Sequence, residues 1–272
     1  MTLRNILIAY SGWTSAQSPL NHALKIAEHH NAWVTGIVGH GRSQLVSLLG
    51  GQAPRDVLET IKKNENEEIQ GAKEVFEETV EKFGRTHASE VLDVFDEDGA
   101  TVASFARTFD LVVTAPHNSR RGEEHMSASP DLIALQSGRP VLIVPKNYDA
   151  KGLSVHVVVA WDGKRASARA IGDAMSMLEE KSKVTVLTIG SVVPPGTKRL
   201  IQNLTRHGIN AKHLQQPNSG TVGGTILSIT QKIEADLIVM GAYEHSKFAH
   251  DVFGGVTTDV LKETTVPVLM SH

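Results

Sequence analysis

The sequence predicts an α/β protein with two tandem, doubly wound, Rossmann-like parallel sheets, each of five strands with helices on both faces. Short apolar runs alternate along the chain with segments whose apolar residues recur at helical spacing. The same order begins again after the polar, turn-prone segment 147–152, which is typical of a linker. Within this repeat Asp236 matches Asp110, and Pro267 matches Pro140.

The first copy of the repeat alternates predicted strands with predicted helices. The strands are expected at residues 6–10, 32–38, 91–95, 111–114 and 140–144, and the helices at 15–30, 54–85, 100–108 and 132–137. The helix 54–85 is the longest and highly charged, and Pro54 suits its first turn. Segment 40–53, which lies between the second predicted strand and this helix, carries an apolar cluster at 45–49 and is expected to form a short helix or a lid.

The second copy follows the same order after the linker. Its strands are expected at residues 155–160, 184–189, 211–215, 237–240 and 266–270, and its helices at 165–181, 197–207, 221–233 and 256–261. We therefore predict an N-terminal domain of residues 1–147 and a C-terminal domain of residues 153–272. In parallel sheets of this kind ligands bind beyond the carboxyl ends of the strands, so the loops after the first and fourth strand of each copy are the places to search.

Composition excludes several classes of function. The 272 residues carry a net charge of -3, which provides no basic field for nucleic acid. The absence of cysteine excludes disulfides, a thiolate nucleophile and a cysteine-based zinc site. Every apolar run is far shorter than the roughly 18 residues of a membrane span, and the first one is too short for a signal sequence. We expect a cytoplasmic protein without a nucleic-acid or membrane partner.

The stretch 236–270 carries the most chemistry. Its first apolar run ends abruptly at Gly241, as a buried strand ends at a loop, and a polar segment then leads to Gly254 and Gly255. The helix predicted from residue 256 begins directly after these glycines. Free N–H groups and the helix dipole favour an anion at such a helix start, and glycine lets the backbone approach it closely.

The chain resembles a tandem universal stress protein, and the resemblance is most specific in GAYEHSKFAHDVFGGVT followed by TTVPVLM. Nucleotide-binding members of that family carry a loop of glycine, two residues, glycine, nine residues, glycine and then serine or threonine. Gly241 and Gly254 fill the first and last glycine positions at matching spacing. Glu244 stands where the middle glycine belongs, Gly255 replaces the hydroxyl residue, and Thr257 matches a hydroxyl position two residues further on.

The resemblance also implies how a nucleotide would be held. It assigns Asp162, which follows the first strand of the second copy, to the base or ribose, and Ile189, which ends the next strand, to the wall of the base site. His245 could donate a hydrogen bond to a phosphate. The implied cofactor is ATP, with or without Mg²⁺, and the implied function is a binding role in the stress response rather than a dedicated enzymatic reaction, with slow ATP hydrolysis at most.

The first copy departs from the family pattern. Ser11 occupies the place of Asp162, Ala115 and Pro116 replace the first glycine, and the segment 127–130 ends in a proline where the last glycines belong. Proline removes a donor N–H. We therefore expect this half to have lost its phosphate loop.

Simpler interpretations remain open for the same residues. The glycines could serve only a tight loop and close helix–sheet packing, and Asp162 before a glycine is also what an Asx turn needs. If Glu244 faces bound phosphates, like charges about 4 Å apart repel by roughly 1 kcal/mol in water and more in a drier site, so Glu244→Gly should strengthen binding. A metal site is not expected, because His29 and His30 occupy adjacent helix positions that face different directions.

Two other functions compete with nucleotide binding. The chain could be a structural or interaction module that presents the long helix and the 45–49 cluster to a protein partner. Alternatively, the cluster could border a pocket for a larger or more apolar ligand. The resemblance to tandem universal stress proteins implies that the two halves pack as a pseudo-dimer through their final strands, 141–144 and 266–270. The sequence leaves open whether two chains form a homodimer.

Overall fold

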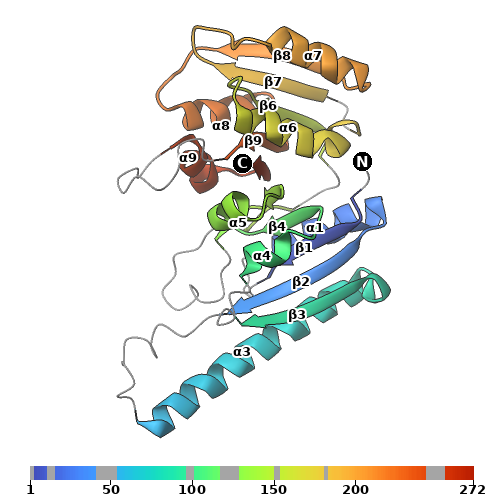
Figure 1. Ribbon diagram of the computed structural model, residues 1–272, viewed down its shortest axis with the longest axis vertical. Helices are drawn as coiled ribbons and strands as arrows, with labels where there is room; N and C mark the ends of the chain where they lie inside the picture. Colours follow the sequence, from blue (N-terminus) through green and yellow to red (C-terminus); the bar gives the residue numbers. More distant parts are fainter. Residues whose placement is uncertain are drawn as a thin grey trace.

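A single twisted sheet of ten strands runs through the molecule (Figure 1). The structure is a computed structural model of the chain, and it describes residues 3–10, 16–40, 54–95, 101–116, 129–149, 154–180, 183–242 and 255–272. The strand order is β3-β2-β1-β4-β5-β10-β9-β6-β7-β8, so the first five strands lie on one side of the β5–β10 contact and the last five on the other. The predicted α/β class is confirmed.

The first half contains the strands and helices expected from the sequence. They are β1 (Asn5–Ala9), α1 (Gln17–His30), β2 (Trp33–His40), α3 (Arg55–Lys82), a short 3-10 helix (Thr86–Ala88), β3 (Ser89–Phe95), α4 (Val102–Ala106), β4 (Leu111–Thr114), α5 (Pro130–Gln136) and β5 (Val141–Ile143). Pro54 precedes α3 as its N-cap residue, one position before the predicted first turn. Segment 41–53, with the apolar cluster of residues 45–49, lies outside the described residues.

The second half repeats this order. Its elements are β6 (His156–Ala160), α6 (Arg165–Leu178), β7 (Lys183–Ile189), α7 (Thr197–Arg206), β8 (Ala211–Gln216), α8 (Val222–Lys232), β9 (Leu237–Gly241), α9 (Val256–Glu263) and β10 (Val268–Ser271). The connection between its second and third strands is α7, of 10 residues, whereas the first half uses α3, of 28 residues. This long helix runs beyond the sheet in Figure 1.

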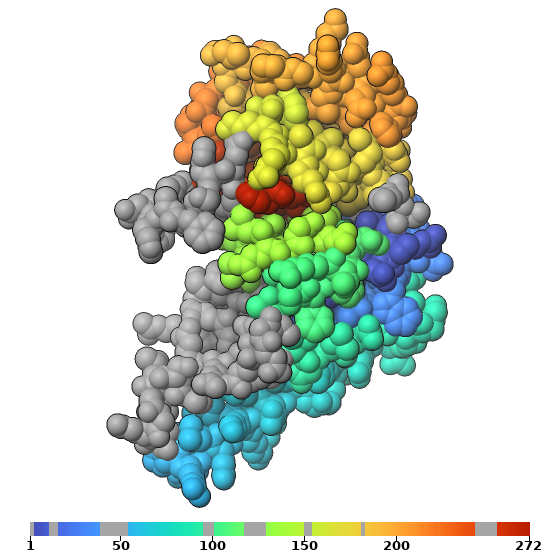
Figure 2. Space-filling model, in the orientation of Figure 1, coloured from blue at the N-terminus to red at the C-terminus, as the bar shows by residue number. Residues whose placement is uncertain are grey.

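The two predicted five-stranded sheets join edge to edge. Strand β5 pairs with β10 in antiparallel orientation, with Leu142 opposite Leu269, whereas the pairs within each half are parallel. The final strands of the two halves therefore meet, as the sequence analysis expected. In Figure 2 the C-terminal residues lie between the two halves on the face shown.

Helices cover both faces of the sheet, as the alternating pattern predicts. One apolar cluster packs α1, α3, α6 and α7 on one face, and includes Leu20, Phe76 and Ala170. The second packs α4, α5, α8 and α9 on the other face, and includes Ile133 and Ile226. Because β5 and β10 contribute to both clusters, each core continues from one half into the other. Among the described helices, none is both long and apolar enough to cross a membrane.

Hydrogen bonds repeat between the halves at the amino edge of the sheet. Asp110 accepts from the backbone N–H of Arg4 and Asn5, at 2.8 and 2.9 Å. Asp236 accepts in the same way from Val155 and His156. Each aspartate precedes the fourth strand of its half and ties it to the start of the first strand. The match of Asp236 with Asp110 in the sequence thus reflects one shared structural role.

Candidate functional site

The candidate site lies at the carboxyl edge of the second half, where the strand order changes direction. The chain leaves β6 to form β7 and β8 on one side and returns to form β9 on the other. Strands β6 and β9 are neighbours, and the helices that follow them, α6 and α9, cover opposite faces of the sheet. This is the position at which doubly wound sheets bind ligands. Asp162 lies two residues beyond β6, and Gly241 is the last residue of β9.

Asp162 forms an Asx turn at the start of α6. Its Oδ1 accepts from the backbone N–H of Lys164 at 3.0 Å and from the hydroxyl of Ser167 at 2.6 Å. The intervening Gly163 has a φ of 79°, which favours glycine. The carboxylate thus lies at the amino end of α6, where the helix dipole stabilises negative charge. The structural role considered in the sequence analysis is confirmed, and Asp162 is also exposed to solvent.

Gly241 is in close contact with the first turn of α6. A Cβ at this position would lie 2.6 Å from the backbone nitrogen of Ser167 and 2.7 Å from the carbonyl carbon of Ala166. Both neighbours are backbone atoms, so a side chain would require the helix to move. Close helix–strand packing therefore explains this glycine without a ligand. Because Ser167 also donates to Asp162, one helical turn brings together the two residues selected from the sequence.

Helix α9 begins at the same edge of the sheet. Gly255 is its N-cap residue, is exposed, and has an extended backbone conformation. Among the described residues, no side chain caps this helix start, and no atom lies within 4 Å of the place of a Cβ on Gly255. Thr257, by contrast, is 6% exposed and belongs to the buried surface of α9. The exposed part of this helix start is therefore its backbone at Gly255 rather than the Thr257 side chain.

Ile189 ends β7 at this edge and is half-buried. It packs against the apolar cluster on the α8 and α9 face. Nearby, the loop before α7 closes over the β6–α6 turn: a Cβ on Gly163 would lie 2.8 Å from that of Pro194, and the indole N–H of Trp161 donates to Thr197 Oγ1 at 3.0 Å. Asp162 lies just beyond β6 and Ile189 ends β7, so the two residues lie at the ends of adjacent strands.

Three of the predicted site residues, Glu244, His245 and Gly254, lie outside the described residues. Two other residues at this edge were not selected from the sequence. Ser167 orients the Asp162 carboxylate, and its only sequence signal is its place in the first turn of α6. Ser271 lies opposite Gly241 in the β9–β10 ladder, and its buried hydroxyl has no hydrogen-bond partner among the described residues. A lone serine at a strand end gives no sequence signal.

The corresponding edge of the first half is built differently. Ser11 lies outside the described residues. Pro130 begins α5, so the first position of that helix has no N–H. Tyr10, which matches Trp161, is 1% exposed and packs edge-on against Phe76, and burial raises its pKa to about 12. These residues are typical of a packed end rather than an anion site.

The geometry of one residue pair corrects an expectation from the sequence. His29 and His30 were expected to face different directions, yet Nε2 of His29 lies 3.1 Å and Nε2 of His30 3.8 Å from the same oxygen, Oε2 of Glu180. The two residues belong to the last turn of α1, where the helix ends in a left-handed residue, Asn31. Glu180 is 150 residues away in the chain, so no local pattern could have revealed this cluster.

Comparison with known proteins gives a family match within the second half, which also contains the candidate site. Residues 217–272 match the model of the Universal stress protein family. This segment holds α8, β9, α9 and β10, and thus includes Gly241, Gly255 and Thr257 but neither Asp162 nor Ile189.

Longer similarities extend over both halves. The Universal stress protein Slr1230 of Synechocystis is 26% identical over 171 residues, which cover 59% of this chain and 57% of that protein. A universal stress protein from Archaeoglobus fulgidus has a similar solved structure, with a TM-score of 0.75, 16% identity and coverage of 100% of this chain and 96% of that one. A protein of unknown function from Pseudomonas aeruginosa PAO1 gives a TM-score of 0.56 at 13% identity, over 99% and 92% of the two chains. At these identities the solved structures establish the fold alone.

Proposed function

We propose that the chain binds an adenine nucleotide at the carboxyl edge of its second half and acts in the stress response through binding rather than catalysis. The observation that carries the proposal is the start of α9. Its backbone N–H groups follow an exposed glycine, which has no side chain to cap them. A helix start of this kind favours an anionic group such as a phosphate. The segment that matches the family model includes this helix.

The residues around α9 fit the other parts of a nucleotide. Asp162 uses Oδ1 to accept from Lys164 and Ser167. Its other oxygen, Oδ2, would then accept from a ribose hydroxyl or a base amino group. Ile189 offers a half-buried apolar surface for the base. From the family pattern, Glu244, His245 and Gly254 would complete the phosphate loop. The ligand we propose is ATP, with or without Mg²⁺.

The proposal assigns different roles to the two halves. We infer two domains of universal stress protein type, residues 1–147 and 153–272, of which only the second binds nucleotide. Pro130 supports this assignment, since it removes an N–H from the first turn of α5 where α9 keeps one. We further propose that the protein acts in the cytoplasm. Whether two chains also pair is a separate question, which sedimentation velocity would answer.

Calorimetric titration of the full chain with ATP, with and without Mg²⁺, tests the proposal. Binding at one site per chain is the expected result. Asp162→Asn should weaken it by about tenfold or more, since a charge-assisted hydrogen bond of 1.5–3 kcal/mol is lost. Ser11→Ala, at the matching position of the first half, is the control and should leave the affinity unchanged. If ATP at millimolar concentration gives neither a heat of binding nor thermal stabilisation, the proposal is wrong.

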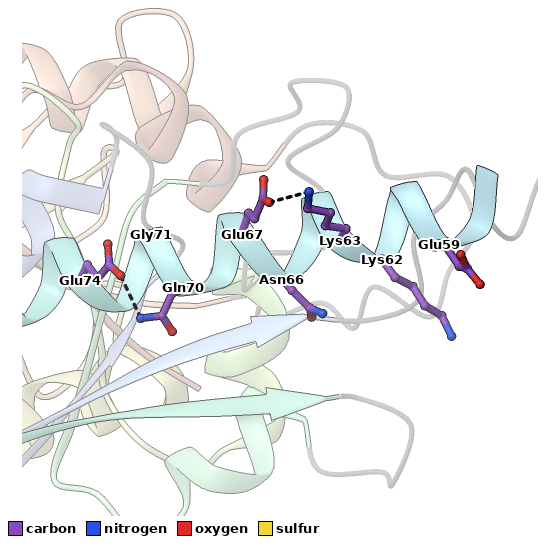
Figure 3. A pocket seen from close by; sticks show the side chains of 8 residues that line it. All are labelled: Glu59, Lys62, Lys63, Asn66, Glu67, Gln70, Gly71 and Glu74. Atoms are coloured by element: carbon purple, nitrogen blue, oxygen red, sulfur yellow. Dashed lines mark hydrogen bonds and ion pairs between the residues drawn. The ribbon is translucent and has the colours of Figure 1, made fainter. Parts of the chain in front are cut away.

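A second candidate function, a module that binds a protein partner, is supported by the surface of α3. A shallow, open pocket lies against one face of this helix, and Figure 3 shows the residues that line it. The side chains that line it are mostly charged or amide-bearing: Glu59, Lys62, Lys63, Asn66, Glu67, Gln70, Gly71 and Glu74. Lys63 pairs with Glu67 at 3.7 Å, and Gln70 donates to Glu74 at 3.0 Å. Charges paired along one helix are also what a solvated face shows.

Native mass spectrometry of the freshly purified full chain separates the two candidates. A nucleotide present in one copy per chain supports the binding proposal and contradicts a purely structural module. A chain that carries no nucleotide, and that ATP does not stabilise, supports the module instead. Charge reversal of Lys62 and Lys63 should then disturb partner binding without any effect on the free energy of unfolding beyond about 0.5 kcal/mol, because both side chains are exposed.

A further inference from the structure

The cluster of His29, His30 and Glu180 lies at the junction of the two halves, far from the candidate nucleotide site in the fold. Nε2 of His29 and Nε2 of His30 lie 3.1 and 3.8 Å from Oε2 of Glu180, and the three ligand-type atoms all lie within 4.8 Å of one another. The histidines come from the end of α1 in the first half. Glu180 follows α6 in the second half, just beyond the C-cap residue Glu179.

The burial of these side chains sets them apart from an ordinary surface ion pair. The side chain of His30 is 4% exposed, whereas those of His29 and Glu180 are 47% and 36% exposed. One imidazole is thus fixed by packing, and the other two groups remain accessible from solvent. The rings of His29 and His30 lie nearly perpendicular, with centroids 4.9 Å apart, so their nitrogens approach one point from two directions.

We propose that His29, His30 and Glu180 bind one divalent transition-metal cation of the zinc type. Two imidazole nitrogens and one carboxylate oxygen form a ligand set that zinc accepts, and a water molecule would complete four-coordination. Tetrahedral zinc with bonds of about 2.0–2.1 Å holds its ligand atoms roughly 3.3 Å apart. The separations of 3.1 and 3.8 Å from Glu180 lie on either side of this value, and all three ligand-type atoms lie within 4.8 Å of one another. Calcium and magnesium, which prefer oxygen ligands, fit the two imidazoles poorly.

The bound ion would join the two halves. It would link α1 to the end of α6 across 150 residues of sequence, alongside the short antiparallel contact of β5 with β10. A metal that binds the folded chain and not the unfolded one stabilises the fold in proportion to the logarithm of its concentration. The ion therefore acts as a clamp between the halves that stabilises the folded chain.

A neighbouring pair provides a control within the same surface. Nδ1 of His207 lies 2.9 Å from Oε1 of Glu179, so this pair has the same residue types at a similar distance but offers only one imidazole. An ion pair between a protonated histidine and a glutamate needs no second histidine. If the first cluster were only an ion pair, the two places would respond alike to zinc.

Titration of the full chain with ZnCl₂ after removal of metals by a chelator tests the proposal. One site per chain is expected, and zinc at a hundredfold excess over its dissociation constant should raise the Tm by about 5 °C. His29→Asn and Glu180→Gln should each weaken zinc binding by at least about tenfold, the loss caused by removing even a supporting residue around a metal. His207→Asn and Glu179→Gln should leave both readouts unchanged.

Three results would overturn the clamp. These are several weak sites that none of the variants alters, equal losses in the His207 and His29 variants, and stronger binding of magnesium than of zinc. His29 and Glu180 are both solvent-accessible, so their variants should fold even if a variant of the buried His30 does not. The titration contains no nucleotide, and its outcome is therefore independent of the proposed nucleotide site.

Discussion

The two edges of the sheet show which parts of the repeat the fold needs. At the amino edge, Asp110 and Asp236 accept the same pair of backbone N–H groups in the two halves. At the carboxyl edge the halves differ: Ala115 follows β4, whereas Gly241 ends β9. At the amino edge, hydrogen bonds within each half join the residue before the fourth strand to the start of the first strand. The described residues of the two halves differ at the carboxyl edge, so this edge can specialise.

The helix that follows each fourth strand shows the same difference. Helix α5 begins with Pro130, which donates no backbone hydrogen bond, whereas α9 begins after Gly255 with its N–H groups in place. The fold tolerates either start because both helices pack on the same face of the sheet. The difference therefore changes what the edge can bind without changing the architecture.

Gly241→Ala should have the largest effect on stability and would show that this glycine is a packing residue. The new Cβ would lie 2.6 Å from the backbone nitrogen of Ser167, and the helix can relieve the overlap only by moving. Overpacking of this kind costs about 1–3 kcal/mol, and we expect the upper part of that range in urea unfolding.

Gly172→Ala is the matched control for that experiment. Gly172 lies in the middle of α6 with no atom within 4 Å of a Cβ, so alanine should raise stability by up to about 1 kcal/mol through helix propensity. If Gly241→Ala does not lower the free energy of unfolding any more than this control does, then α6 does not pack closely against Gly241. A role in backbone approach to a ligand would then be the better explanation of the glycine.

Asp110→Ala and Asp236→Ala test whether the amino edges are equivalent. Each change removes a carboxylate that accepts from two backbone N–H groups, at a cost of about 2 kcal/mol for a charge-assisted contact that is partly solvated. Both variants should lower the free energy of unfolding by similar amounts, within about 0.5 kcal/mol of each other. A loss confined to one half would contradict the shared role.

Periodicity predicted most of the fold because both kinds of element carry their own pattern. The four-residue strand β4 was predicted at its observed bounds, since three apolar residues and Thr114 follow the polar Asp110 and end before Pro116. The weak strand β8 was also predicted, at residues 211–215, although it is an edge strand whose exposed residues do not alternate strictly. The joining of the two sheets through their final strands was implied by the family resemblance rather than by periodicity.

The site was harder to predict because its residues serve packing as well. Asp162 was selected for a ligand, yet its oxygen also orders the turn before α6. Gly241 was selected for backbone approach to a phosphate, yet helix packing requires it. The cluster of His29, His30 and Glu180 was missed because it depends on two helices from different halves. The spacing of residues in the sequence predicts which side chains share a face of one helix or strand. It does not predict contacts between distant segments such as these.

His156→Asn should remove part of the pH dependence of stability. His156 is buried at the start of β6, where β1 has Asn5, and its Nδ1 donates to the carbonyl of Ile233. The neutral ring therefore accepts from Thr185 through Nε2 at 2.9 Å. Burial, and then the charge of Lys183, lower the pKa of His156 below the ordinary 6.5.

The direction of this effect follows from proton binding. Between pH 6.5 and the lowered pKa the unfolded chain binds a proton on His156 that the folded chain does not, so stability is lost as the pH falls through this window. One such group changes the free energy of unfolding by at most about 1.4 kcal/mol per pH unit. Urea unfolding at several pH values should give a shallower dependence for His156→Asn than for the wild type. Parallel curves would show that His156 is not buried in its neutral form.

Gly255→Ala should have the smallest effect on stability and separates the two glycines of the candidate site. The backbone of Gly255 is extended, and no atom lies within 4 Å of its Cβ position, so alanine should fit within about 0.5 kcal/mol. Packing thus explains Gly241 but gives no reason for glycine at 255. If a phosphate lies against this helix start, the new methyl group should weaken ATP binding while the unfolding curve stays unchanged. If affinity and stability are both unaffected, the open space at Gly255 is not where the phosphates bind.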